Sequence, residues 1–167
     1  MLYYNIEDFM SNTRCDNHEK CISTTIDQVE RICTEKGLRF TKIRKAILEI
    51  IWESHQPIKA YDILSKISNI NYSEKPPTVY RALDFLMENG FVHKINSLNS
   101  YVGCSHPNKH SDCYFVICSI CNEVQECCDS TITKTIKKVL NKNTFKHDHI
   151  ALEVNGQCND CTDVSGK

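Results

Sequence analysis

Long apolar runs are absent from this sequence: none approaches the roughly 20 residues that a membrane-spanning helix needs, so such a helix is excluded. The first ten residues contain Glu7 and Asp8 but no basic residue, unlike a secretory signal peptide. We therefore expect a cytoplasmic protein. Internal repeats and low-complexity segments are missing too. With 167 residues, 41% of them apolar and 25% charged, the chain is expected to form one globular domain or two small ones.

Two enzyme motifs are also missing. The chain has neither H-E-x-x-H nor an H-x-E motif followed by P-C-x-x-C, which are the signatures of two classes of zinc enzyme. A dithiol oxidoreductase is the remaining enzyme alternative, because paired cysteines occur. We expect that the protein is not an enzyme and takes no small-molecule substrate.

A strong net charge is lacking as well, since the total is −1. Its distribution is uneven, however. Residues 36–103 hold ten Lys and Arg against six Asp and Glu, a balance of +4. Residues 1–35 hold three against seven, or −4, and residues 104–167 hold seven against eight, or −1. A basic middle segment between acidic ends favours contact with DNA through that segment.

Cysteine is abundant. There are eleven, an odd number that rules out complete internal pairing. A secreted chain of this composition would be expected to form disulfides, but in the reducing cytoplasm metal ligation is the better expectation. Cys33 falls on the inner face of a predicted helix and should be buried as a small apolar residue. Cys113, Cys127 and Cys128 are expected to pack or to remain free.

The N-terminal two thirds of the chain have the pattern of a winged helix. Residues 1–22 are polar and irregular, an extension of unknown role. Helical periodicity then predicts helices that start at Ser23 or Thr24 and at Thr41, followed by helices over 60–70 and 78–89. After Gly90 the period changes to two, which predicts strands over 91–95 and 100–103. The order predicts a winged helix-turn-helix domain over 23–103, with 78–89 as recognition helix.

The C-terminal part has a different pattern. Beyond a hinge loop at 104–110, residues 111–167 predict strands at 113–117, 123–127 and 151–154 and a helix at 130–141. Their apolar residues are too few for a convincing core, so this domain needs a metal, a partner subunit or both. The predicted fold class is α+β.

Two C-x-x-C pairs are the strongest chemical signal. Cys118 and Cys121 form one pair, and Cys158 and Cys161 the other. A two-residue spacing lets both thiolates reach one ion from a tight turn, and four thiolates give tetrahedral zinc with no open position. The site would therefore be structural. Unrelated cysteine pairs, a redox disulfide and an iron centre are the alternatives.

A second set of candidate ligands is His93, Cys104, His110 and Glu126, whose donors suit zinc or another borderline divalent ion. They lie on both sides of the expected domain boundary, so one ion could fix the relative orientation of the domains. Spacing alone also fits ordinary surface residues.

A third cluster, Cys15, His18 and Cys21, has ligands three residues apart, although an acidic disordered arm with unrelated cysteines is the favoured explanation. His147 and His149 flank Asp148 in an expected solvated turn, with His149 a candidate for a subsidiary site.

Several of these segments resemble one family. Gly37-Leu-Arg-Phe-Thr-Lys-Ile-Arg44 with Ile47-Leu48 resembles the opening of the winged helix in ferric uptake regulators. Pro77-Thr-Val-Tyr-Arg-Ala-Leu83 resembles their recognition helix, and the two cysteine pairs match their structural zinc site. The run 75–94, followed by 99–102 and Cys104, is closer to the zinc uptake regulator branch. The resemblance covers roughly residues 27–161.

The resemblance implies a homodimeric, zinc-responsive repressor that binds operator DNA when its regulatory site is filled and controls zinc uptake genes. It implies two Zn²⁺ per monomer, a C-terminal dimerisation domain, and a regulatory site formed by His93, Cys104, His110 and Glu126. The loop around His110 is one residue shorter than the family pattern, so His106 is a rival third ligand. Cys15, His18 and Cys21, and the pair Cys127 and Cys128, depart from that pattern.

For DNA contact, the resemblance indicates Tyr80 and Arg81 at the start of the recognition helix, together with Tyr61 and Lys75. Arg39 and Arg44 are expected to touch phosphates or to form pairs within the protein. A sensor of iron, manganese or peroxide is the alternative function. Cys104 argues against it, because a soft thiolate favours zinc over iron or manganese.

Overall fold

The computed structural model describes residues 17–70, 75–107, 112–148 and 150–162. The chain divides into two compact units, Met1–Ser105 and His106–Lys167, a division that falls within the stretch expected to be a hinge. In the described ranges, none of the helices combines the length and the apolar character that crossing a membrane requires.

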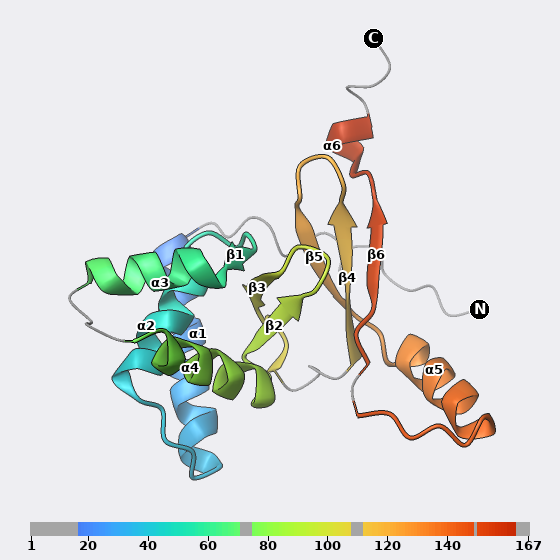
Figure 1. The fold of residues 1–167 in the computed structure, drawn as a ribbon, viewed down its shortest axis with the longest axis horizontal. Coiled ribbons are helices and arrows are strands. Elements are labelled where there is room, and N and C mark those ends of the chain that lie inside the picture. The colour runs from blue at the N-terminus through green and yellow to red at the C-terminus, as the bar shows by residue number, and fades with distance from the viewer. Residues whose placement is uncertain (1–16, 71–74, 108–111, 149, 163–167) are drawn as a thin grey trace. The chain divides into compact units, whose positions relative to one another are not determined.

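The first unit has the expected order of four helices and a hairpin, with one short added strand (Figure 1). Its elements are α1 (His18–Glu35), α2 (Lys42–Trp52), β1 (Ile58–Lys59), α3 (Ala60–Asn69), α4 (Pro76–Glu88), β2 (Val92–Ile95) and β3 (Ser100–Gly103). The strands form an antiparallel sheet in the order β1-β3-β2. The winged helix-turn-helix prediction is confirmed, with β2 and β3 as the wing.

Helix α1 begins at His18, earlier than the expected start at Ser23 or Thr24. The reason is a cap: the side-chain oxygen of Asn17 accepts a hydrogen bond from the Lys20 backbone N–H at 3.0 Å. Such a cap satisfies one of the N–H groups that a helix start leaves unpaired. Residues 18–22 therefore belong to the helix and not to an irregular extension.

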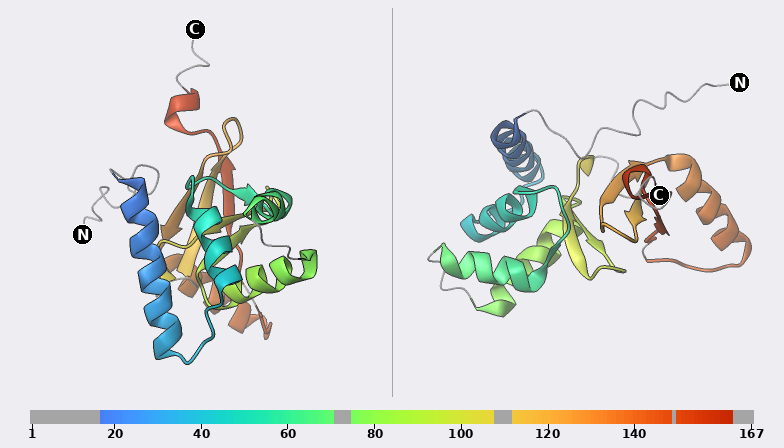
Figure 2. Two further views of the ribbon diagram at one scale, coloured as in Figure 1. Left: turned by 90° about the vertical axis from the view of Figure 1, so that its left-hand side faces the viewer. Right: turned by 90° about the horizontal axis from the view of Figure 1, so that it is seen from above.

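The core of the first unit is built around α2, which contacts α1, α3, α4 and β3; Figure 2 shows α1 and α2 from two further sides. In the contact between α2 and β3, the position on β3 that faces Trp52 has room only for glycine. A Cβ atom at Gly103 would lie 2.3 Å from the indole ring of Trp52. The wing strand β3 thus lies directly against the end of α2, which holds the wing to the helical core.

The second unit is a three-stranded sheet with two helices (Figure 1). Its elements are β4 (Cys113–Cys118), β5 (Val124–Cys128), α5 (Ser130–Lys142), β6 (Glu153–Gly156) and α6 (Asn159–Thr162). The strand order is β5-β4-β6, with β4 antiparallel to β5 and parallel to β6. Strand β6 lies slightly later than expected, and α6, which carries Cys161, was not expected.

Candidate metal centres

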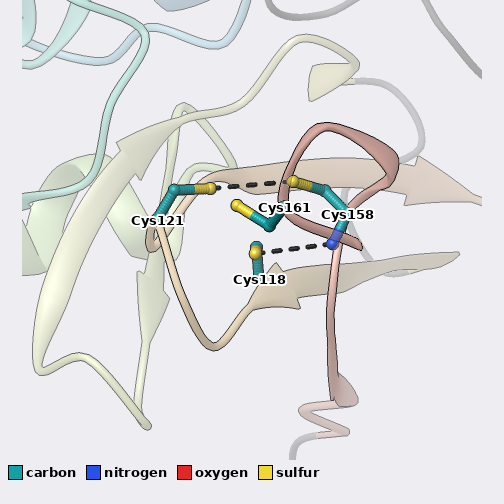
Figure 3. A group of neighbouring side chains, drawn as sticks. All are labelled: Cys118, Cys121, Cys158 and Cys161. Carbon is teal, nitrogen blue, oxygen red and sulfur yellow. Dashed lines mark hydrogen bonds between the residues drawn. The ribbon is translucent and has the colours of Figure 1, made fainter. Parts of the chain in front are cut away.

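The two C-x-x-C pairs meet at one end of the second unit's sheet (Figure 3). Cys118 is the last residue of β4 and Cys121 lies in the turn that follows. Cys158 precedes α6, and Cys161 lies within it. The parallel pairing of β4 with β6 places Cys118 opposite Gly156, and the Ser119 N–H donates to the Gly156 carbonyl at 2.8 Å. This pairing brings together two segments 40 residues apart.

The four sulfur atoms have the spacing of a zinc site. All lie within 4.8 Å of one another, and the Sγ atoms of Cys121 and Cys158 are 3.8 Å apart. Sulfurs at tetrahedral positions around zinc, each about 2.3 Å from the metal, are separated by about 3.8 Å. A disulfide would need about 2.05 Å. The residues present therefore fit a four-thiolate zinc ion and do not form two disulfides.

Backbone hydrogen bonds fix each pair. The Asn122 N–H donates to the Cys118 carbonyl at 2.9 Å, and Asn122 has a left-handed φ of 59° that closes the turn. Asparagine tolerates this conformation better than most residues. In the other pair, the Cys161 N–H donates to the Cys158 carbonyl at 3.0 Å.

The electrostatics of the cluster favour a cation. Backbone N–H groups of Cys121, Cys158 and Ile120 donate to the Cys118 sulfur and lower the pKa of that thiol to about 6. The Cys158 N–H is one of these donors, at 3.4 Å. The neighbouring Cys158 thiol, together with desolvation and the other two sulfurs, raises the pKa of Cys161 to about 12. Four thiols thus cannot all ionise side by side unless a cation compensates the charge, which a bound dication does.

The second candidate set is divided between the two units. In the first unit, His93 lies in β2 opposite Val102 of β3, and the Cys104 N–H donates to the Phe91 carbonyl at 2.9 Å. A ring nitrogen of His93 and the Cys104 sulfur lie within 4.8 Å of each other, and both side chains are buried. In the second unit, Glu126 is a buried carboxyl group on β5. His110, the fourth expected ligand, lies outside the described residues.

His106, the rival of His110, belongs to the second unit and lies beside Glu126. The Cys128 sulfur is 3.6 Å from His106 Nδ1 and 3.7 Å from Glu126 Oε1, and the three donors lie within 4.8 Å of one another. Cys128 was expected to pack or to remain free, as was Cys113, but the two form a disulfide. They occupy directly opposite positions on β4 and β5, a register that sequence spacing does not reveal. Cys127 is a free thiol, as expected.

The candidate DNA contacts lie on the surface of the first unit. Tyr80 and Arg81 are exposed in the first turns of α4, and Lys75 is the exposed residue before it. Tyr61, in the first turn of α3, is 75% exposed. Arg44 instead has partners within the protein: its guanidinium carbon lies 3.4 Å from the centre of the Phe85 ring, and its side chain donates to the Arg39 carbonyl.

Two minor candidates remain. Cys15 and His149 lie outside the described residues, whereas His18 and Cys21 both lie on α1. His55, which lies between α2 and β1, contacts both of these side chains. No spacing rule connects His55 with residues more than 30 positions earlier, so local spacing contains no signal for this contact. Cys33 is buried, as expected.

Comparison with known proteins identifies the family of this chain. The sequence model of the ferric uptake regulator family matches residues 35–155. The zinc uptake regulation protein of Escherichia coli (strain K12) is 39% identical over 140 residues, which cover 82% of this chain and 81% of that protein.

Two solved structures are also similar. The holo form of XcZur has a TM-score of 0.79 and 40% identity, and the match covers 84% of this chain and 98% of that one. A zinc uptake regulator complexed with zinc and DNA has a TM-score of 0.81 and 35% identity, covering 87% of this chain and 98% of that one. The chain described here therefore belongs to the ferric uptake regulator family.

Proposed function

We propose that this protein is a zinc-responsive transcriptional repressor, which binds operator DNA as a homodimer when its regulatory site holds zinc and so controls zinc uptake genes in the cytoplasm. The observation that carries the proposal is the 39% identity to a zinc uptake regulation protein over 82% of the chain. The similarity to a regulator solved with zinc and DNA supports both ligands.

Two zinc ions per monomer are proposed, with different roles. The first is held by Cys118, Cys121, Cys158 and Cys161, whose sulfur spacing fits a closed tetrahedral site. Four protein thiolates leave no position for a water molecule or a substrate, so this zinc stabilises the fold. Its location at the end of β4 and β6 joins α6 to the sheet.

The second zinc is proposed to bind His93, Cys104, His110 and Glu126. The support is the resemblance to the zinc branch of the family, together with the buried thiol of Cys104 near the His93 ring. A thiolate favours zinc over iron or manganese. This choice of ligand argues against the alternative of an iron, manganese or peroxide sensor. His106 can replace His110, because it already lies near Glu126.

Regulation then follows from linkage. We assign the DNA-binding domain to residues 23–103, the hinge to 104–110 and the dimerisation domain to 111–167. The role of residues 1–22 is unassigned, although residues 18–22 form the start of α1. A zinc ion bound by residues on both sides of the hinge would restrict the relative movement of the two domains. If the restricted form is the one that binds operator, zinc shifts the population toward it. Operator DNA must then raise zinc affinity by the same factor.

DNA contact is proposed through α4. Its N-terminal turns carry Tyr80 and Arg81 on the exposed side, where a recognition helix meets base edges in the major groove. An arginine there commonly binds guanine in a bidentate manner. Lys75, which precedes the helix, and Tyr61, at the start of α3, are proposed as contacts to the DNA backbone because both side chains are exposed.

The dimer is proposed to form through the second unit. Val139 of α5 is 54% exposed, and Phe145, just after this helix, is 59% exposed. Apolar side chains at this exposure on a sparsely packed unit fit a surface that a second subunit covers. This assignment agrees with the need for a partner that the composition of residues 111–167 indicates.

The test is a Cys104→Ser variant, which exchanges a soft thiolate for a poor neutral oxygen ligand and leaves the four-cysteine cluster intact. The variant should fold, dimerise and keep its structural zinc, but lose the second zinc and at least 10-fold in zinc-dependent operator affinity, about 1.4 kcal/mol. Cys127→Ser is the matched control, because it removes a half-buried thiol outside both ligand sets. A zinc content per chain equal to that of the wild type, together with wild-type operator binding, in Cys104→Ser would refute the regulatory assignment.

The choice of metal is tested on the wild-type protein. Operator binding is titrated with zinc and, in parallel, with manganese and ferrous iron. We expect half-maximal operator binding at a much lower concentration of zinc than of manganese or iron. An equal or better response to iron or manganese would favour the alternative sensor.

A further inference from the structure

Three potential metal ligands meet at a place in the first unit that is distant in sequence from both zinc sets. His18 opens α1, and Cys21 lies three residues later on the same helical face. His55 comes from the turn between α2 and β1. All three side chains are half-buried. The Sγ atom of Cys21 lies 3.9 Å from Nε2 of His55, and the His18 and His55 rings have centres 4.9 Å apart.

The distance between the donor atoms of Cys21 and His55 fits a shared metal ion. The three donor atoms do not all lie within 4.8 Å of one another, so the His18 side chain has to turn to bring its nitrogen to that ion. For a thiolate and an imidazole nitrogen at tetrahedral positions around zinc, bond lengths of about 2.3 and 2.05 Å give a separation of about 3.6 Å. The observed 3.9 Å between Cys21 and His55 needs a movement of a few tenths of an ångström. A single thiol–imidazole hydrogen bond also explains that pair, but it does not explain why a second imidazole lies against the first.

The surroundings of both rings also suit ligation. Nε2 of His18 contacts the carbonyl oxygen of Glu53. A ring that donates from Nε2 carries its lone pair on Nδ1, and metal-bound histidines almost always donate their other N–H to a carbonyl or carboxylate in this way. His55 is held edge-on to the Trp52 ring, with centres 5.4 Å apart.

We propose that His18, Cys21 and His55 bind a third divalent cation of borderline softness, of which zinc is the biological example. Two nitrogens and one thiolate are a donor set that zinc prefers over magnesium, calcium or manganese. The sequence contains one further thiol, Cys15, three residues before His18. It lies outside the described residues, and the proposal rests on the other three.

The consequence of such an ion is local. It would add a link between the first turn of α1 and the turn after α2, two segments of the same unit that the His18–Glu53 and Cys21–His55 contacts and the packing of the His18 and His55 rings already join. The first turn of α1 is held by the Asn17 cap and by the Cys21 N–H bond to the Asn17 carbonyl at 3.0 Å. Metal binding should therefore make this turn more resistant to opening.

The first experiment counts zinc per chain in the full-length protein and in the variants Cys21→Ser and His55→Asn. Asparagine is chosen because His55 has a φ of 50°, a left-handed conformation that asparagine tolerates. We expect each variant to contain one zinc fewer per chain than wild type, while circular dichroism and dimerisation are unchanged. His147→Asn is the matched control, since it removes a half-buried imidazole from the other unit and should keep the wild-type count. Wild-type zinc content in both Cys21→Ser and His55→Asn would overturn the proposal.

A second measurement guards against loss of zinc through altered folding. Hydrogen exchange of the Cys21 amide, which reports on the first turn of α1, is compared in wild type and His55→Asn with zinc added and after chelation. The wild-type amide should exchange at least several-fold more slowly with zinc, and the variant amide should not respond. An equal response in both proteins would show that the ion acts elsewhere and would overturn the site. This result is independent of operator binding, so it does not depend on the proposed function.

Discussion

The two units of this protein are stabilised in different ways. In the first unit, α2 alone buries Ala46, Ile47, Leu48, Ile50, Ile51 and Trp52. In the second, α5 is longer than α2 but buries only Thr133 among its residues. Among the described residues of the second unit, the buried apolar side chains all lie on β4 and β5.

The difference shows where metal is needed. Each fully buried Leu or Ile contributes about 1.5–3 kcal/mol to folding, so the first unit has ample driving force of its own. A unit with few buried apolar side chains usually requires a metal, a disulfide or a partner subunit. The second unit contains a four-cysteine cluster and a disulfide. We therefore expect the second unit to depend on zinc and the first unit on its core.

The largest expected effect comes from breaking the four-cysteine cluster. Cys158→Ser should lose on the order of 10 kcal/mol of metal-linked folding free energy, and with it dimerisation and solubility. Hydrogen exchange resolved by unit should show loss of protection in β4–β6, while α2 and α4 stay protected. Cys127→Ser is the control. A soluble Cys158→Ser dimer of native stability would contradict the structural role of this zinc.

The second prediction breaks the core of the first unit. Leu48 is fully buried, so Leu48→Ala should cost about 2–5 kcal/mol through lost burial and the cavity that remains. Denaturant unfolding followed by the fluorescence of Trp52, the single tryptophan, measures this change in the first unit. The loss should be the same before and after removal of the structural zinc. A loss of unfolding free energy that appears only in the zinc-free protein would show that the first unit also depends on zinc for its stability.

The third prediction compares two DNA-facing residues of the first unit. Arg81→Ala should cost about 1–3 kcal/mol in operator binding and relax the preference at one base position, if the arginine contacts a base edge. Lys75→Ala should weaken binding to all DNA sequences alike and reduce the salt dependence of the DNA affinity, as expected of a phosphate contact. Binding to operator and to random DNA is measured at several salt concentrations. An unchanged ratio of specific to random affinity in Arg81→Ala would mean that Arg81 only positions the protein.

The smallest expected effect concerns the start of α1. Asn17→Ala removes the side chain that accepts the Lys20 N–H, and should cost about 1 kcal/mol. Asn17→Asp keeps an accepting oxygen and should be nearly neutral. Equilibrium unfolding of both variants measures the difference. Equal stability of the two variants would show that the cap does not hold this turn.

Local patterns were sufficient for most of the fold. The apolar spacing in residues 41–52 and 78–89 predicted α2 and α4 to within about two residues, because helical periodicity acts over a few turns. Glycine at 90, with a φ of 75°, marked the end of α4. The start of α1 was missed because a single capping residue, Asn17, decided it. The two-residue strand β1 was missed because it exists only through pairing with β3.

The candidate sites also combine features that local spacing predicts with contacts that it does not predict. Local spacing was enough to predict the two C-x-x-C pairs, since a separation of two residues already brings both thiols of a pair to one side of a turn. Which distant groups meet depends on how the helices and strands pack. Parallel pairing of β4 with β6 joined the two cysteine pairs, and the antiparallel register of β4 and β5 placed Cys113 against Cys128. The path of the chain after α2 brought His55 to Cys21. Such contacts depend on strand register and helix packing, which join residues far apart in the chain and leave no trace in local spacing.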